Sequence, residues 1–462
     1  MPPFLALLLT GAFITFLFAW EARRNGGFSR ALWLPLVWML ITGSRFVSQW
    51  LAIWGVLPGG VGGSAGEGSP LDALVFLGLI LTGLWVLRKR RLKLRVIFRD
   101  NTWLVVFFVY CFLAVLWSDF PFVAAKRWIK ILGHPVMALI ILTEPDPEGA
   151  IRAVLKRMAF VFLPASILLI KYYPHIGRGF DMWSGDPTNH GAHLNKNELG
   201  YVCMITGVFF AWNLLLALRW RRSKERRDEL ALSVGFLAMV AWLTHMAKSS
   251  TSLACLMIGV AVLLVLGSGT VKLRHLGSYI IGGVLLFLLL DTTFGIYAKG
   301  VALLGRDPTL TDRTEVWADA ISIVKDPFLG AGFESFWLGE RLQKMWEKWW
   351  WQPNQAHNGY IEVYLNLGLA GVAILLGWIV STFLKIKKSL LVSFEYGRFR
   401  LAFLFVVLAY NYTEATFKGV SLVWTIFHLI SIDYGRRARS ASPPAAQNYS
   451  ASNYGDAYPN HR

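Results

Sequence analysis

Six basic residues of this sequence could together bind a multivalent anion on one face of the protein. Each lies in a polar segment between apolar runs, and they are Arg127, Arg178, Lys196, Lys248, Arg306 and Arg313. The planar guanidinium group of arginine matches the oxygens of a phosphate, so several such cations around one cavity could hold a diphosphate without a metal ion. The alternative is that individual members of this set only contact lipid headgroups.

A histidine stands directly before a long apolar run and could act as a base. His357 precedes a helix expected over residues 358–383, so its ring lies near the positive end of the helix dipole, which favours the neutral imidazole. A neutral histidine close to an arginine that holds an anion can accept the proton of an attacking hydroxyl. The simpler interpretation is a structural hydrogen bond at the start of the helix. We favour the base, because Arg313 and Trp317 belong to the same polar segment.

The sequence contains no recognisable motif for binding a nucleotide or a metal ion. It contains neither a P-loop nor a GxGxxG turn after a strand, so we expect no nucleotide cofactor. Three histidines share one polar segment, but the spacing of His175, His190 and His193 fits no compact ligand pattern, and we expect no metal site. The energy for a reaction would then come from an ion gradient or from an activated substrate.

The elements that must position these residues are membrane helices. Of the 462 residues, 55% are apolar and only 16% are charged, and runs long enough to span a bilayer recur throughout. We therefore predict an all-α, polytopic membrane bundle of about 12–13 transmembrane helices. The net charge of +18 lies mostly in short connections between apolar runs, which indicates membrane orientation and not nucleic-acid binding.

The basic segment at residues 88–95 is the strongest cytoplasmic marker, and alternation from it places residues 305–371 outside. We expect four parts: residues 1–290 hold the first ten membrane helices, residues 291–357 form a large outer loop with short amphipathic helices, residues 358–435 hold the C-terminal membrane helices, and residues 436–462 form a disordered tail. Arg127 then lies at an outer helix end, where it binds an anion or extends to the headgroups. Arg45, inside an expected span, is either paired within the bundle or lines a polar cavity.

Several segments resemble a known superfamily. The sequences DRTEVWADAI with Arg313, DPFLGAGFESF, and AHNGYIEVYLNLGLAG with His357 resemble the C-terminal signature of the O-antigen ligase and O-antigen polymerase superfamily of bacterial envelope enzymes. LNKNELG around Lys196 and the WSDFP turn before Arg127 are similar to earlier blocks of that superfamily. The superfamily usually has glycine where this chain has Asp312, and often reads HKN where this chain has NKN. These departures bear on the subfamily more than on the superfamily.

The resemblance implies a membrane glycosyltransferase that needs no metal ion. Such an enzyme, a polysaccharide polymerase or an O-antigen ligase, transfers glycan from an undecaprenyl-diphosphate-linked donor to a glycan or to lipid A-core. It works on the periplasmic face of the inner membrane, among membrane lipids and other polysaccharide-export proteins. By resemblance, Arg313 would hold the diphosphate and His357 would serve the acceptor; polymerase is slightly favoured. The alternative is a transporter or flippase of lipid-linked saccharides, which inverted repeats or paired broken helices would favour.

Overall fold

The computed structural model describes residues 1–24, 27–57, 68–181, 185–294, 299 and 313–434. Within these ranges the chain is almost entirely helical, and its only strands form one short antiparallel pair, β1 (Arg178–Phe180) with β2 (Pro187–Asn189). The predicted all-α class is therefore confirmed. Arg306, most of the segment between residues 295 and 312, and the tail from residue 435 lie outside the described residues.

Seven helices among the described residues are long and apolar enough to cross a membrane. They are α1 (Pro3–Arg24), α4 (Pro70–Lys89), α9 (Pro147–Tyr172), α11 (Lys196–Leu218), α12 (Lys224–Ala247), α13 (Ser250–Gly267) and α18 (Gly359–Val392). Two bent pairs raise the number to nine if each pair is one span: η1 and α2 (Arg30–Leu32, Trp33–Thr42) with α3 (Val47–Ile53), bent by 63°, and α5 (Leu94–Asp100) with α6 (Thr102–Leu113), bent by 96°. This is a polytopic membrane protein.

The count is lower than the twelve or thirteen spans expected, because some apolar runs form short helices. The expected span at residues 126–143 consists of α7 (Pro121–Ile131) and α8 (Gly133–Leu142). Pro135 has no backbone N–H with which to continue α7, so a new helix begins at Gly133. Near the C-terminal end of the described chain, α19 (Phe394–Thr413) is followed by the ten-residue helix α20 (Leu422–Ser431).

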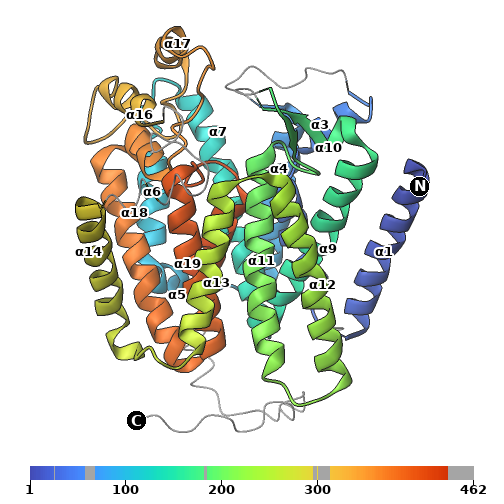
Figure 1. Ribbon diagram of the computed structural model, residues 1–462. Helices are drawn as coiled ribbons and strands as arrows, with labels where there is room; N and C mark the ends of the chain where they lie inside the picture. Colours follow the sequence, from blue (N-terminus) through green and yellow to red (C-terminus); the bar gives the residue numbers. More distant parts are fainter. Residues whose placement is uncertain (25–26, 58–67, 182–184, 295–298, 300–312, 435–462) are drawn as a thin grey trace.

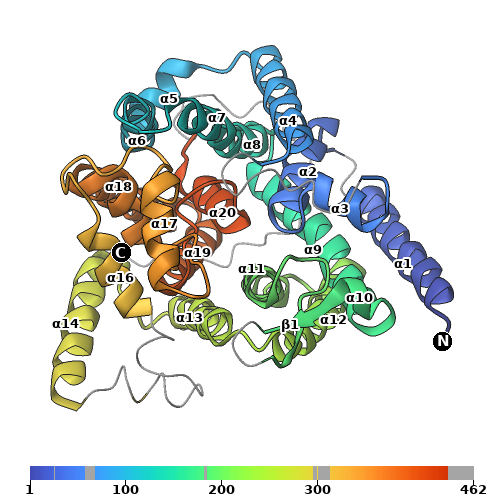
Figure 2. The ribbon, with the colours of Figure 1, turned by 90° about the horizontal axis from the view of Figure 1, so that it is seen from above.

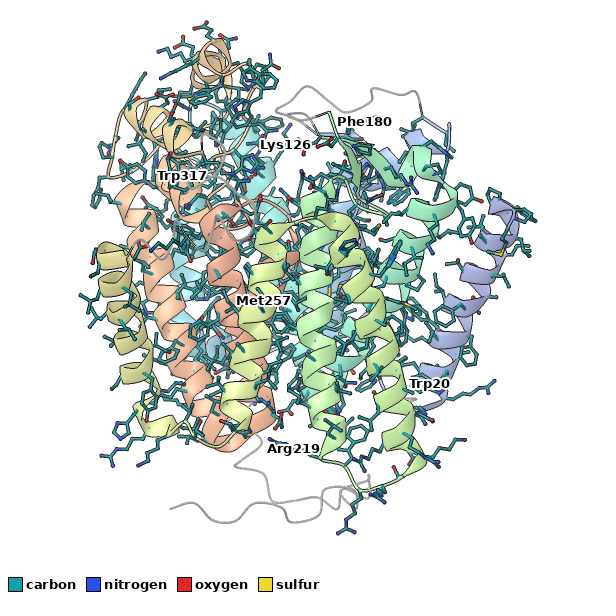
Figure 3. The ribbon with its side chains drawn as sticks, viewed as in Figure 1. Trp20, Lys126, Phe180, Arg219, Met257 and Trp317 are labelled. Atoms are coloured by element: carbon teal, nitrogen blue, oxygen red, sulfur yellow. The ribbon has the colours of Figure 1, made fainter. Side chains whose placement is uncertain are left out.

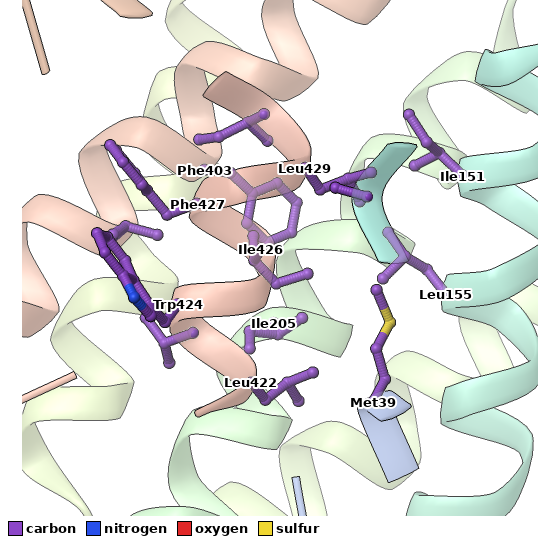
Figure 4. Packing of buried hydrophobic residues seen from close by; sticks show 14 of the residues in the cluster. Met39, Ile151, Leu155, Ile205, Phe403, Leu422, Trp424, Ile426, Phe427 and Leu429 are labelled. Atoms are coloured by element: carbon purple, nitrogen blue, oxygen red, sulfur yellow. The ribbon is translucent and has the colours of Figure 1, made fainter. Parts of the chain in front are cut away.

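The helix α20 lies inside the bundle and is buried on every side. It packs against α8 and α19, and Figure 4 shows its residues Leu422, Trp424 and Phe427 among apolar side chains of the neighbouring helices. A helix that is apolar all round is stable only in such surroundings. Because α20 is fixed in the core, it holds in place the polar segment at residues 414–421 that connects it to α19.

The bundle has two distinct ends. In Figure 1 the helices run side by side, with α16 (Arg313–Ser322), α17 (Gly339–Lys348), α10 (Pro174–Gly177) and the β1–β2 hairpin at one end. Figure 2 shows α1 and α14 (Leu276–Phe294, after η2, Leu273–His275) at the rim. Figure 3 places Trp317, Lys126 and Phe180 at the end with α16, and Arg219 at the opposite end. The segments predicted to be outside therefore share one end of the molecule.

The described residues 313–357, called here the outer segment, have a small apolar core of their own. Its members come from α16, α17, their connections and the start of α18, and include Val316, Ala320, Trp337, Met345 and Trp349. The indole of Trp349 donates to Asp319 at 2.9 Å, and Trp346 donates to the carbonyl oxygen of Pro353 at 3.0 Å. The tryptophans at residues 346 and 349 thus hold the outer segment together, whereas Trp350 is 68% exposed.

Two glycines allow the backbone of the outer segment to pack closely against α18. Gly368 lies at a break within α18 with a φ of +64°, and a Cβ atom there would lie 2.1 Å from the carbonyl oxygen of Phe328. Gly330, with a φ of +73°, meets the backbone of α18 in the same way. Only glycine permits this backbone conformation and this close approach. The contact anchors the outer segment to α18 just beyond its first two turns.

Candidate functional site

The carboxylate of Glu414 brings together side chains from three distant segments. Its Oε1 accepts hydrogen bonds from Nη2 of Arg313 at 3.3 Å and from Nδ2 of Asn197 at 3.0 Å. Its Oε2 lies 3.4 Å from Nδ1 of His357. Arg313 also donates through Nη1 to the carbonyl oxygen of Thr413. The two residues expected to carry the chemistry, Arg313 and His357, therefore meet on one carboxylate.

Glu414 is ionised in these surroundings. Burial raises the pKa of its carboxyl group, but the hydrogen bond from His357 and the positive charge of Arg313 outweigh this effect, and the pKa lies below its ordinary value. The Glu414 side chain is 11% exposed, whereas those of Arg313 and His357 are 21% and 25% exposed. The carboxylate thus lies beneath a cation and an imidazole that both remain accessible to a ligand.

Arg313 is the first residue of α16 and is placed by the packing of that helix. Val316 and Ala320, one turn apart, are buried and fix the inner face of the helix. The indole of Trp317 donates to the carbonyl oxygen of Ala356 at 2.6 Å. The helix that carries Arg313 is therefore tied directly to the residue that precedes His357.

His357 has an unusual backbone conformation, with a φ of +49°. This left-handed region is unfavourable for residues other than glycine and persists where neighbouring contacts fix it. Here Asn358 caps α18 by accepting from the N–H groups of Tyr360 and Ile361, and it donates to the carbonyl oxygen of Tyr412 at 3.0 Å. These bonds fix the position of His357 against the end of α19.

The contact with Glu414 also determines which nitrogen of His357 can act as a base. Nδ1 of His357 lies 3.4 Å from Oε2 of Glu414 and also 3.4 Å from Nε2 of Gln355. An ionised carboxylate only accepts hydrogen bonds, so its contact with His357 requires the proton on Nδ1. In the neutral ring, Nε2 then has the free lone pair. A carboxylate that orients a histidine in this way also stabilises the imidazolium that forms when Nε2 accepts a proton.

The other predicted anion-binding residues lie in less direct positions. Lys196 forms an ion pair with Asp181, and Arg178 donates through Nε to the carbonyl oxygen of Ile170 at 2.9 Å. Both therefore stabilise the hairpin loop, which is the connection between α9 and α11 that contains β1 and β2. Asn197, the neighbour of Lys196, donates a hydrogen bond to Glu414. Lys248 is exposed at the end of α12. None of these contacts tests anion binding by Arg178, Lys196 or Lys248, which stays a prediction.

Arg127 lies against the outer segment. It donates to the carbonyl oxygen of Glu334, and the carboxylate of Glu334 accepts from the backbone N–H of Gly419. Gly419 belongs to the same α19–α20 connection as Glu414. Arg127 is thus linked through Glu334 to the segment that carries the central carboxylate, and its predicted role toward an anion is likewise untested.

Two of the three histidines of the outer loop, His190 and His193, make structural hydrogen bonds. Nη2 of Arg45 donates to Nδ1 of His190 at 3.0 Å and to the carbonyl oxygen of Ile176 at 2.8 Å, so Arg45 is paired. His193 donates to the carbonyl oxygen of Gly43, and burial lowers its pKa to about 3. In the part of the chain that the structure describes, no group of three or more His, Cys, Asp or Glu side chains is placed to hold a metal ion.

Two residues of the site, Glu414 and Asn197, were not among those expected from the sequence. Asn197 lies within the LNKNELG block, but Lys196 attracted attention there as the cation. Glu414 is an acidic residue in a short polar turn between two apolar runs. This placement is the sequence feature that could have identified it as a candidate site residue. Its importance comes from contacts that span 57 to 217 residues of sequence.

Residues 204–376 match the model of a protein family described as O-antigen ligase. The resemblance to the O-antigen ligase and polymerase superfamily is confirmed. The matched region contains Arg313 and His357, whereas Asn197 and Glu414 flank it. The chain is also similar to the exopolysaccharide production protein ExoQ of Rhizobium meliloti (strain 1021), with 27% identity over 303 residues, which are 63% of this chain. The chain spans 66%, just under two thirds, of the length of that relative.

Proposed function

We propose that the protein is a glycosyltransferase that transfers or polymerises glycan from an undecaprenyl-diphosphate-linked donor, without a metal ion. The family match and the exopolysaccharide relative support a glycan ligase or polymerase. The observation that carries the proposal is the meeting of Arg313 and His357 on Glu414. Of the two activities we favour polymerase, because the relative is named for exopolysaccharide production.

In this proposal, an acceptor hydroxyl attacks the anomeric carbon of the donor sugar. A new glycosidic bond forms, the bond between that carbon and the diphosphate oxygen breaks, and the hydroxyl proton passes to Nε2 of His357. The lipid diphosphate leaves with the bonding electrons, and Arg313 stabilises its negative charge. Glu414 holds Nδ1–H of His357 and stabilises the imidazolium.

Because Arg313 and His357 share the carboxylate of Glu414, donor binding and reaction of the acceptor follow a defined order. The bond from Nη2 of Arg313 to Glu414 is 3.3 Å long, so an incoming diphosphate can compete for this guanidinium. When Arg313 turns toward the diphosphate, Asn197 and His357 remain as the side chains that contact the Glu414 carboxylate. Donor binding then strengthens the base, and the donor is expected to bind before the acceptor reacts.

The proposed location is the inner membrane, with the site facing the periplasm. The site lies at the end of the bundle with α16, while Arg219, from a segment predicted to be cytoplasmic, lies at the other end (Figure 3). Membrane lipids surround the bundle, and other polysaccharide-export proteins are expected to receive the product.

A lipid-linked saccharide transporter is the second candidate, and the two bent helix pairs are the observation that favours it. In transporters, broken helices form the substrate site. Here the α2–α3 break holds Arg45, which is hydrogen-bonded to the hairpin loop, and the α5–α6 break holds Asn101, which accepts from Lys385. Among the described residues, the side-chain partners of Glu414 are Asn197, Arg313 and His357, which lie in neither break, so transferase is the better proposal.

Reconstituted protein with purified lipid-linked repeat units tests this proposal. We expect longer glycan chains on the lipid, formed equally well with a chelator present. Transfer to lipid A-core without chain growth would identify a ligase. Movement of the donor across the vesicle membrane with no new glycosidic bond would identify a transporter, and loss of activity with chelator would overturn the metal-free mechanism.

A further inference from the structure

A second carboxylate, that of Glu362, lies buried close to the site. Glu362 is in the first turn of α18 and is 1% exposed. Its Oε1 accepts from the backbone N–H of Ala356 at 2.6 Å, from the indole of Trp337 at 3.0 Å and from Nζ of Lys418 at 3.1 Å. Nδ2 of Asn366 lies 3.4 Å from Oε2. A buried charge is costly unless it is paired and hydrogen-bonded, and this one is both.

The donors to Glu362 belong to the pieces of chain that form the site. Ala356 directly precedes His357, so the hydrogen bond to its N–H fixes the chain on one side of the left-handed residue. Lys418 lies four residues after Glu414, in the α19–α20 connection. Trp337 belongs to the core of the outer segment, together with Val316 of α16. One carboxylate therefore joins the segments of His357, Glu414 and Arg313.

We propose that Glu362 is a positioning residue for the transfer reaction, acting through Ala356 and Lys418 to set the contact between His357 and Glu414. This inference rests on the proposed function. The contact it sets is 3.4 Å long, at the outer limit of a hydrogen bond, so a displacement of a few tenths of an ångström breaks it. Asn358 fixes the chain on the other side of His357, so the hydrogen bond to Glu362 helps to determine how far the histidine lies from the carboxylate.

The experiment replaces each partner of the ion pair by a residue of similar size. Glu362→Gln keeps an oxygen that can accept from Ala356 and Trp337 but removes the charge that holds Lys418. Lys418→Met removes the ammonium group from a side chain that is 26% exposed, and leaves the other donors in place. The matched control is Glu229→Gln, because Glu229 forms a buried ion pair with Lys156, at 2.6 Å, and accepts from Asn213, and neither partner belongs to the site.

The reconstituted transfer assay supplies kcat, the KM for donor and the pH–rate profile, each per folded protein. For Glu362→Gln we expect kcat to fall by about 10-fold or more, with the KM for donor nearly unchanged, because orientation and not binding is lost. A carboxylate beside an imidazole stabilises its protonated form. A looser contact should therefore also change the pH–rate profile. Lys418→Met should show the same changes more weakly.

Several outcomes decide the inference. The control should lower the amount of folded protein but leave kcat and the profile of the remainder as in wild type. Wild-type kcat and profile in folded Glu362→Gln, or in Lys418→Met if the first variant does not accumulate, would overturn the positioning role while the proposed function stands. Wild-type protein that forms no glycosidic bond would overturn the proposed function, and the inference with it.

Discussion

Replacing Glu414 by glutamine tests the carboxylate that joins Arg313 to His357. Glutamine has nearly the same shape but no charge and only one acceptor oxygen. Arg313 therefore loses its ion pair, and the amide oxygen can accept either from Arg313 and Asn197 or from Nδ1–H of His357, but not from both sides. Two unit charges at 3.3 Å attract by about 5 kcal/mol in a medium of effective dielectric constant near 20. Burial of the carboxylate and partial exposure of Arg313 cancel much of this, and we expect a net loss of about 1–3 kcal/mol of stability.

The pH dependence of this loss has a definite sign. The pKa of Glu414 is lowered in the folded protein, so its stabilising charge is present above the ordinary pKa of a glutamate and is lost as the pH falls through the lowered value. Wild type should therefore unfold at a higher temperature than Glu414→Gln at pH 7. In acid, where wild-type Glu414 is also neutral, the two unfolding temperatures should converge.

The assay combines thermal unfolding in detergent at several pH values with glycan transfer after reconstitution. We expect transfer to fall by about 10²- to 10⁴-fold, as for the loss of a base or of the acid that orients it. Glu315→Gln is the matched control, because Glu315 is exposed on α16 and should change neither quantity. Equal unfolding temperatures at pH 7 together with wild-type transfer in Glu414→Gln would refute the reasoning.

Two further predictions concern the cations. Arg313→Lys should lose most transfer activity, because one ammonium group cannot reproduce the fork that meets both Glu414 and Thr413 and can turn to a diphosphate; near-normal activity of this variant would show that a simple positive charge suffices. Alanine at Lys196 or at Arg178 should weaken donor binding, measured by titration with lipid-linked donor, while the protein stays folded; unchanged affinity in both variants would leave these residues with the loop contacts that they make in the structure.

The sequence was sufficient for the fold class but not for the number of spans. Long apolar runs such as α9 and α11 are unambiguous, because about 20 apolar residues are needed to cross a bilayer. The run at residues 126–143 is apolar as a whole, yet Pro135 divides it into two short helices. The ten-residue α20 looks like a short span but is stable because it is enclosed by other helices. Such enclosure is a property of the packed bundle and not of the local sequence.

The candidate site was predicted in part, for a similar reason. Arg313 and His357 could be found from their residue types and their place in the polar outer segment. Glu414 and Glu362 could not, because their roles depend on donors contributed by distant segments: Arg313 is 101 residues from Glu414, and Lys418 is 56 residues from Glu362. Trp337 and Trp349 are core residues and hydrogen-bond donors of the outer segment, and their acceptors, Glu362 and Asp319, also lie far away in the sequence.

The division of labour between Arg313 and His357 is the central claim, and one measurement tests it most directly. Purified Arg313→Ala and His357→Ala are each supplied with lipid-linked donor, with and without the sugar acceptor, in the presence of chelator. Arg313→Ala should impair both transfer and the slow release of glycan to water, whereas His357→Ala should reduce transfer by about 10²- to 10⁴-fold and leave release to water largely intact. Near-normal transfer by His357→Ala would contradict the account and leave this histidine as a structural residue at the start of α18.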